Sequence, residues 1–69
     1  MQIILSILLY LNVISSPGTY TASEIRDDIL NNQSAVMSVQ SDAVLLNDII
    51  KTYKTKVTGI TVLDDGQLR

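Results

Sequence analysis

The stretch that decides the fold is Ser38–Arg69, which reads SVQSDAVLLNDIIKTYKTKVTGITVLDDGQLR. Residues 38–56 predict one amphipathic helix, because apolar residues recur at alternating gaps of four and three positions. These apolar residues are Val39, Ala43, Leu46, Ile50, Tyr53 and Val57. Ser38 or Ser41 can cap the start of this helix, and Asp42 lies in its first turn, where a carboxylate favours the helix dipole.

Residues 57–69 predict a short β-hairpin. Residues 58–63 are rich in β-branched side chains, and Asp65-Gly66 is a strong hairpin-turn signal. Only Gln67–Arg69 remain to form the return strand. An earlier segment, Thr19-Tyr20 or Val36-Met37, is therefore a further candidate partner for this strand, and the alternative is that the chain is the N-terminal part of a longer protein.

Positive charge gathers toward the end of the chain. The net charge is −2, but residues 1–50 hold one basic and five acidic side chains, whereas residues 51–69 hold four basic and two acidic ones. The acidic total argues against a nucleic-acid binder, while the basic end coincides with the helix terminus and hairpin, where a winged domain meets DNA. The competing interpretation is that lysines in a last helical turn only complement the helix dipole.

The first sixteen residues are almost entirely aliphatic and predict a buried helix, at the centre of a small domain or at a dimer interface. A secretory signal would carry positive charge near its start, whereas the first basic residue is Arg26. A membrane span needs about 20 apolar residues, whereas this run stops after about a dozen. A secreted or anchored protein stays an alternative, and it predicts that residues 1–16 extend away from the rest. Because a domain of this size buries only about 60% of its unfolded surface, we expect self-association through residues 3–14.

The residues that follow the loop at positions 15–18 predict the start of a second helix. Thr21 is the candidate N-cap, and Glu24 stands at the capping-box spacing. Tyr20 and Ile25 stand at the positions of a hydrophobic staple. The helix should end near Asn31-Asn32, since asparagine is unfavourable in helix interiors.

The order of these segments resembles the winged helix-turn-helix transcription regulators of bacteria and their phages. Residues 5–11 are similar to the first helix of that family, residues 20–25 to the start of its second, residues 46–53 to its recognition helix and residues 60–69 to its wing. The resemblance implies a mainly α fold with a small β-hairpin, in which residues 1–69 form a single three-helix, winged-helix-like domain.

One spacing departs from that family, whose turn between the second and third helices is tight. About ten residues separate Leu30 from Ser41. Residues 33–40 could instead form a short third helix, with residues 42–56 as a fourth.

The composition argues against catalysis. The chain contains neither histidine nor cysteine, so the commonest general base, the common nucleophile pairings and most transition-metal sites are excluded. We expect no enzyme activity, no metal site and no cofactor. The lack of cysteine fits a reducing compartment, and we expect a cytoplasmic protein.

The function that these observations favour is sequence-specific binding of double-stranded DNA in transcriptional regulation, as a dimer. The side chains expected at the major groove are Gln40, Ser41, Val44 and Asn47. The side chains expected at phosphates are Lys51, Lys54, Lys56 and Arg69. The alternative is a protein–protein interaction or assembly module on a winged-helix-like fold without DNA binding, which the acidic total and the apolar first helix favour.

Overall fold

The computed structural model describes residues 2–64, and this part of the chain contains four helices and two strands. In chain order the elements are α1 (Gln2–Tyr10), β1 (Gly18–Thr21), α2 (Ala22–Asn31), α3 (Gln33–Gln40), α4 (Ala43–Val57) and β2 (Ile60–Leu63). The fold is mainly helical with a small β element, as the sequence predicts. It has four helices in place of the three that the family resemblance implies.

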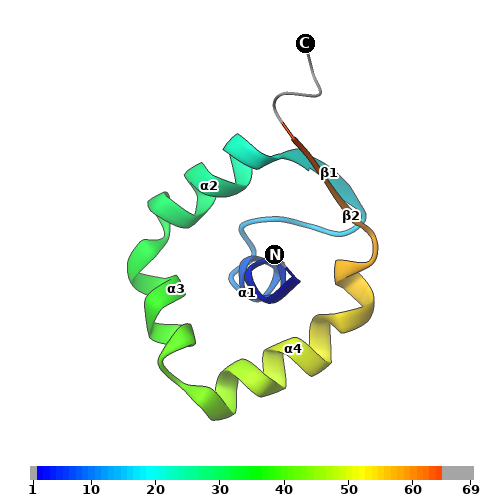
Figure 1. The fold of residues 1–69 in the computed structure, drawn as a ribbon. Coiled ribbons are helices and arrows are strands. Elements are labelled where there is room, and N and C mark those ends of the chain that lie inside the picture. Colours follow the sequence, from blue (N-terminus) through cyan, green and yellow to red (C-terminus); the bar gives the residue numbers. More distant parts are fainter. Residues whose placement is uncertain (1, 65–69) are drawn as a thin grey trace.

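The elements that follow α1 form a ring around it (Figure 1). The chain runs from β1 through α2, α3 and α4 to β2, and the pairing of β2 with β1 closes the ring. In Figure 1, α1 is seen end-on in the middle, and it packs chiefly against α4 with a smaller contact to α3. The first helix is therefore the centre of the core.

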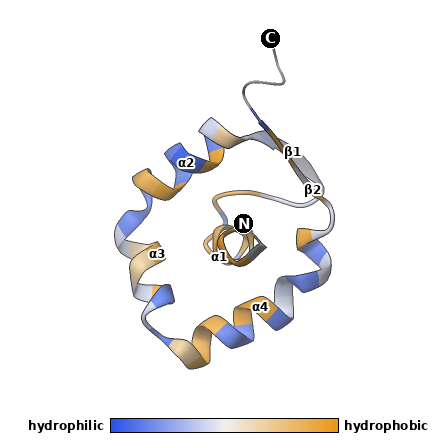
Figure 2. Cartoon of the chain, viewed as in Figure 1, coloured by the Kyte–Doolittle hydropathy of each residue, from blue (hydrophilic) through white to orange (hydrophobic). Residues whose placement is uncertain are grey.

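The aliphatic sequence of α1 explains its central place, because a helix that is apolar all round must be buried on nearly all sides. Five of its side chains are at most 6% exposed: Leu5, Ser6, Ile7, Leu8 and Leu9. Figure 2 shows α1 as a hydrophobic centre. Other elements and the loop after α1 complete the core with Ile14, Ile25, Val36, Val39, Ile49 and Val57.

The burial of α1 confirms the predicted buried helix, which ends at Tyr10, and it bears on two interpretations of the first sixteen residues. The ring of the same chain covers most of the aliphatic side chains of residues 3–14, so a second copy is not needed to cover them. The alternative of a secreted or anchored protein predicted that residues 1–16 extend away from the rest, whereas the described part of this segment, residues 2–16, packs at the centre of the core. Among residues 2–64, no helix has both the length and the apolar character that crossing a membrane requires.

The end of α1 is a Schellman motif built on Asn12. The Val13 amide donates to the Leu8 carbonyl at 3.0 Å, and the Asn12 amide donates to the Leu9 carbonyl at 3.1 Å. Asn12 has a φ of 61°, the left-handed conformation that this motif requires at the residue after the C-cap. This turn directs the chain back along the core, so that Ile14 is buried.

The start of α2 is the capping box that the sequence predicts. The Thr21 hydroxyl accepts from the Glu24 amide at 3.1 Å, and the Glu24 carboxylate accepts from the Thr21 amide at 3.4 Å. The helix ends at Asn31, also as predicted. Asn32 follows, and its side-chain amide donates to the Asp28 carbonyl at 2.9 Å, which helps to terminate α2.

The single helix predicted over residues 38–56 is wrong at its start. Residues 33–40 form α3 and α4 begins only at Ala43, which is the four-helix alternative. The break has a local cause. The Ser41 hydroxyl donates to the carbonyls of Met37 and Ser38 at the end of α3, both at 3.0 Å. Asp42 is extended and accepts the Leu45 amide at 3.1 Å, so it is the N-cap of α4 and not a residue of its first turn.

The two strands form a parallel pair in the register Gly18–Ile60, Thr19–Thr61, Tyr20–Val62 and Thr21–Leu63. The partner of β2 is thus the Thr19-Tyr20 segment, one of the two earlier candidates. The other candidate, Val36-Met37, is helical. Parallel pairing is possible here because three helices separate the strands, whereas a hairpin turn joins only antiparallel ones. The predicted turn at Asp65-Gly66 and the return strand Gln67–Arg69 lie outside the described residues.

We expect Ile7→Val to lower the free energy of unfolding by about 1 kcal/mol, because it removes one methylene from a fully buried position and leaves a cavity. Ile3→Val is the matched control, since Ile3 is 49% exposed on the same helix, and it should change stability by less than about 0.5 kcal/mol. Urea denaturation measures both. Equal losses in the two variants would contradict the central position of α1.

We expect Asn12→Val to destabilise the fold by about 1–2 kcal/mol, because a β-branched residue is strained at positive φ. Asn12→Gly should be neutral or stabilising, since glycine adopts this conformation without steric cost. Urea denaturation of the two variants provides the comparison. A glycine variant less stable than the valine variant would rule out this account of the turn.

Candidate nucleic-acid interface

The outer face of α4 consists of Val44, Asn47, Asp48, Lys51, Lys54 and Thr55, all of them exposed. It exists because the opposite side of the helix is apolar and packs on the core through Leu45, Leu46, Ile49, Tyr53 and Val57. At about 100° per residue, positions 44, 47, 51 and 54 fall on one side of a helix. Val44 is 79% exposed, which makes it the most exposed of the large apolar side chains in residues 2–64.

The structure brings together four of the predicted DNA contacts on this face: Val44, Asn47, Lys51 and Lys54. Gln40 is exposed at the end of the preceding helix, α3. Ser41 is exposed too, but its hydroxyl is engaged by two carbonyls at the end of α3. Arg69 lies outside the described residues.

Lys56 does not belong to the same face. It stands five residues after Lys51, which places it about 140° further around the helix. Its ammonium lies 5.4 Å from the centroid of the Tyr53 ring, a cation–π geometry on the side of α4 that faces the loop after α1. The predicted basic cluster is therefore divided: Lys51 and Lys54 lie on the outer face, whereas Lys56 is also exposed but lies beside the loop after α1.

Charge is separated across the ring. α2 carries three acidic side chains and one arginine, whereas α4 carries three lysines and one aspartate, which gives net charges of −2 and +2. The two helices lie on opposite sides of α1 (Figure 1). Within residues 2–64, no ion pair or hydrogen bond engages the ammonium group of Lys51 or Lys54. An approaching anion therefore meets the α4 side of the molecule favourably and the α2 side unfavourably.

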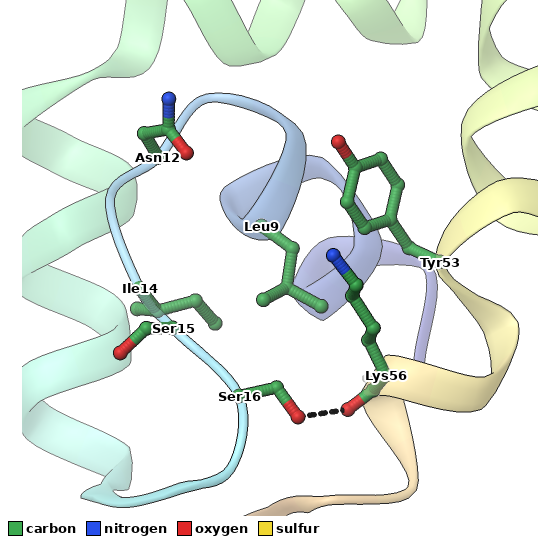
Figure 3. Close-up of a pocket in the computed structure, with 7 residues that line it drawn as sticks. All are labelled: Leu9, Asn12, Ile14, Ser15, Ser16, Tyr53 and Lys56. Atoms are coloured by element: carbon green, nitrogen blue, oxygen red, sulfur yellow. Dashed lines mark hydrogen bonds between the residues drawn. The ribbon is translucent and has the colours of Figure 1, made fainter.

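A cavity of about 190 Å³ lies between α4 and the loop after α1, and Figure 3 shows its seven lining residues. They are Leu9, Asn12, Ile14, Ser15, Ser16, Tyr53 and Lys56. Two hydrogen bonds position the loop. The Ser16 hydroxyl donates to the Lys56 carbonyl at 2.6 Å, and the Ser15 amide donates to the Tyr20 hydroxyl at 3.0 Å.

Sequence reasoning missed this cavity, although a signal was present. Asn12, Ser15 and Ser16 are the polar residues that interrupt and follow the aliphatic run. Their approach to Lys56 depends on the turn at Asn12 and on a contact between residues 40 positions apart in the chain. Sequence periodicity carries no information about such a contact.

Other kinds of site find little support in the part of the chain that the structure describes. Residues 2–64 contain no group of three or more carboxylate, histidine or cysteine side chains that could hold a metal ion. Comparison of the chain with protein-family models, with curated proteins and with solved structures finds no match. The resemblance to winged helix-turn-helix regulators thus stays a prediction from the sequence.

Proposed function

We propose that this protein binds double-stranded DNA through the outer face of α4 and acts in transcriptional regulation in the cytoplasm. The observation that carries the proposal is the exposed row of Asn47, Lys51 and Lys54 on one side of a capped helix whose other side is fixed to the core. An α-helix fits the major groove of B-DNA, where an asparagine can pair with adenine and lysines can reach phosphates.

Two features support this use of α4 in particular. It is the longest helix of the described chain, at 15 residues. Because its inner face packs on the core, the side chains of its outer face are held at fixed positions relative to one another. The acidic helix α2 lies across α1 from α4, away from a duplex docked on the outer face of α4. Asp48 is the one carboxylate within the outer face, and it is suited to accept a hydrogen bond from cytosine.

We expect the affinity for a duplex to fall with salt at a log–log slope of about −2 per protomer, because Lys51 and Lys54 neutralise two phosphates. Fluorescence anisotropy of a labelled duplex at 50 and 200 mM salt measures the slope, which corresponds to roughly a tenfold loss of affinity. The double variant Lys51→Gln/Lys54→Gln should abolish most of this dependence.

Arg26→Gln is the matched control for that experiment, since it removes a positive charge from α2 on the opposite side of the ring. It should leave duplex binding unchanged. Binding that does not depend on salt, or that falls equally in the control and the lysine variant, would refute the proposal.

A second candidate function, protein assembly without DNA, is favoured by a separate observation. Five large apolar side chains of the described chain are between 41% and 79% exposed: Ile3, Tyr10, Leu30, Met37 and Val44. Ile3 and Tyr10 are seven residues apart, which places them within about 20° on one side of α1. In the expected self-association through residues 3–14, these two side chains are the candidate contacts. The other side chains of that helix are mostly covered by the ring.

If copies associate through this side of α1, the double variant Ile3→Gln/Tyr10→Gln should shift the protein toward monomer in sedimentation velocity. Removing apolar area from an interface weakens association because that area becomes hydrated in the separated chains. Leu30→Gln is the control, since Leu30 is 60% exposed on α2. A monomer in all three proteins at every concentration would exclude self-association through α1.

A further inference from the structure

The cavity between α4 and the loop after α1 has the composition of a binding site for a small organic anion. We propose that it binds a short-chain monocarboxylate, with the ammonium of Lys56 as the charge partner and the side chains of Leu9 and Ile14 as the apolar wall. This inference goes beyond the proposed DNA binding and does not depend on it, since Lys56 lies away from the outer face of α4.

The charge of the lining is positive. Lys56 is the one ionisable side chain among the seven lining residues apart from the Tyr53 phenol, and the lining holds no carboxylate. In Figure 3, Lys56 and Tyr53 lie on the α4 side of the cavity, while Asn12 and Ser15 lie on the loop side. A carboxylate that enters next to Lys56 therefore meets a cation without a competing anion in the lining.

Hydrogen-bonding capacity is also available in the lining. Within residues 2–64, the side-chain amide of Asn12 and the Tyr53 hydroxyl make no hydrogen bond to another side chain or to the backbone. Both groups can donate to an oxygen acceptor. The Ser16 hydroxyl, by contrast, is engaged by the Lys56 carbonyl, and this bond fixes the loop against the last turn of α4.

In this proposal, the small apolar part of the lining favours an organic anion over an inorganic one. Leu9 and Ile14 supply the apolar part of the lining, and because they are 6% and 5% exposed, a bound chain would touch only a small area of core hydrocarbon. A volume of about 190 Å³ corresponds to roughly six waters at about 30 Å³ each. Butyrate, with four carbon and two oxygen atoms, matches this size. A phosphate dianion would bring two charges to a single lysine and would leave the apolar wall without a partner.

The test is a titration of the whole protein with butyrate, followed by the backbone amide resonances in NMR without DNA. We expect saturable shifts at residues 12–16 and 53–56. Lys56→Gln, which retains most of the side-chain length, should weaken butyrate binding by about three- to tenfold, the lower figure reflecting solvent screening of an exposed ammonium. Lys54→Gln is the matched control on the outer face and should change the affinity by less than about twofold.

Butylamine, 1-butanol and inorganic phosphate complete the design. The cationic amine should not bind, and the neutral alcohol should bind more weakly than butyrate. Resonances that do not shift with butyrate, an affinity unchanged by Lys56→Gln in a folded variant, or binding of phosphate as tight as butyrate would overturn the proposal. Because Lys51 and Lys54 carry the DNA proposal and Lys56 carries this one, either can fail while the other holds.

Discussion

The burial of α1 inside a ring of the same chain is the constraint on which the rest of the structure depends. A 69-residue chain without cysteine has no disulfide to stabilise it, and a domain of this size covers a modest share of its surface. Placing a helix that is apolar on all sides at the centre lets every other helix bury one face against a common core. The parallel pairing of β1 with β2 then closes the ring, so two strands of four residues each connect the ends of a long path around α1.

This architecture determines which surfaces are free to act. Since α2, α3 and α4 each turn an apolar face inward, their outward faces differ mainly in charge, and the ring places the acidic α2 opposite the basic α4. A total charge of −2 therefore describes the molecule poorly. The same geometry separates lysines that are close in sequence: Lys51 and Lys54 point outward, whereas Lys56 stands over Tyr53 beside the loop after α1. One helix thus carries two exposed lysines on its outer face and forms one wall of a small cavity.

Much of the local structure could be read from the residues. The aliphatic run of residues 3–14 indicated a buried helix, and the Thr21–Glu24 spacing indicated the capping box, because both depend on interactions within one or two turns. The β-branched residues 58–63 indicated a strand for the same local reason. The outer face of α4 follows from helical periodicity alone, which places Val44, Asn47, Lys51 and Lys54 on one side of the helix. Periodicity failed at Ser41-Asp42, since an apolar pattern can continue in phase across a helix break that side-chain hydrogen bonds impose.

The sequence by itself determined that this is a mainly helical domain with a small β element, a central aliphatic helix and an amphipathic helix ending in lysines. Tertiary structure alone decided that β2 pairs with β1 in parallel, that α1 is enclosed by its own chain, and that Lys56 meets Asn12, Ser15 and Ser16 around a cavity. The physical reason is the range of the interactions involved. Caps and periodicity act between neighbours along the chain, whereas strand pairing and the Ser16–Lys56 hydrogen bond join segments about forty residues apart, and these exist only once the ring has closed.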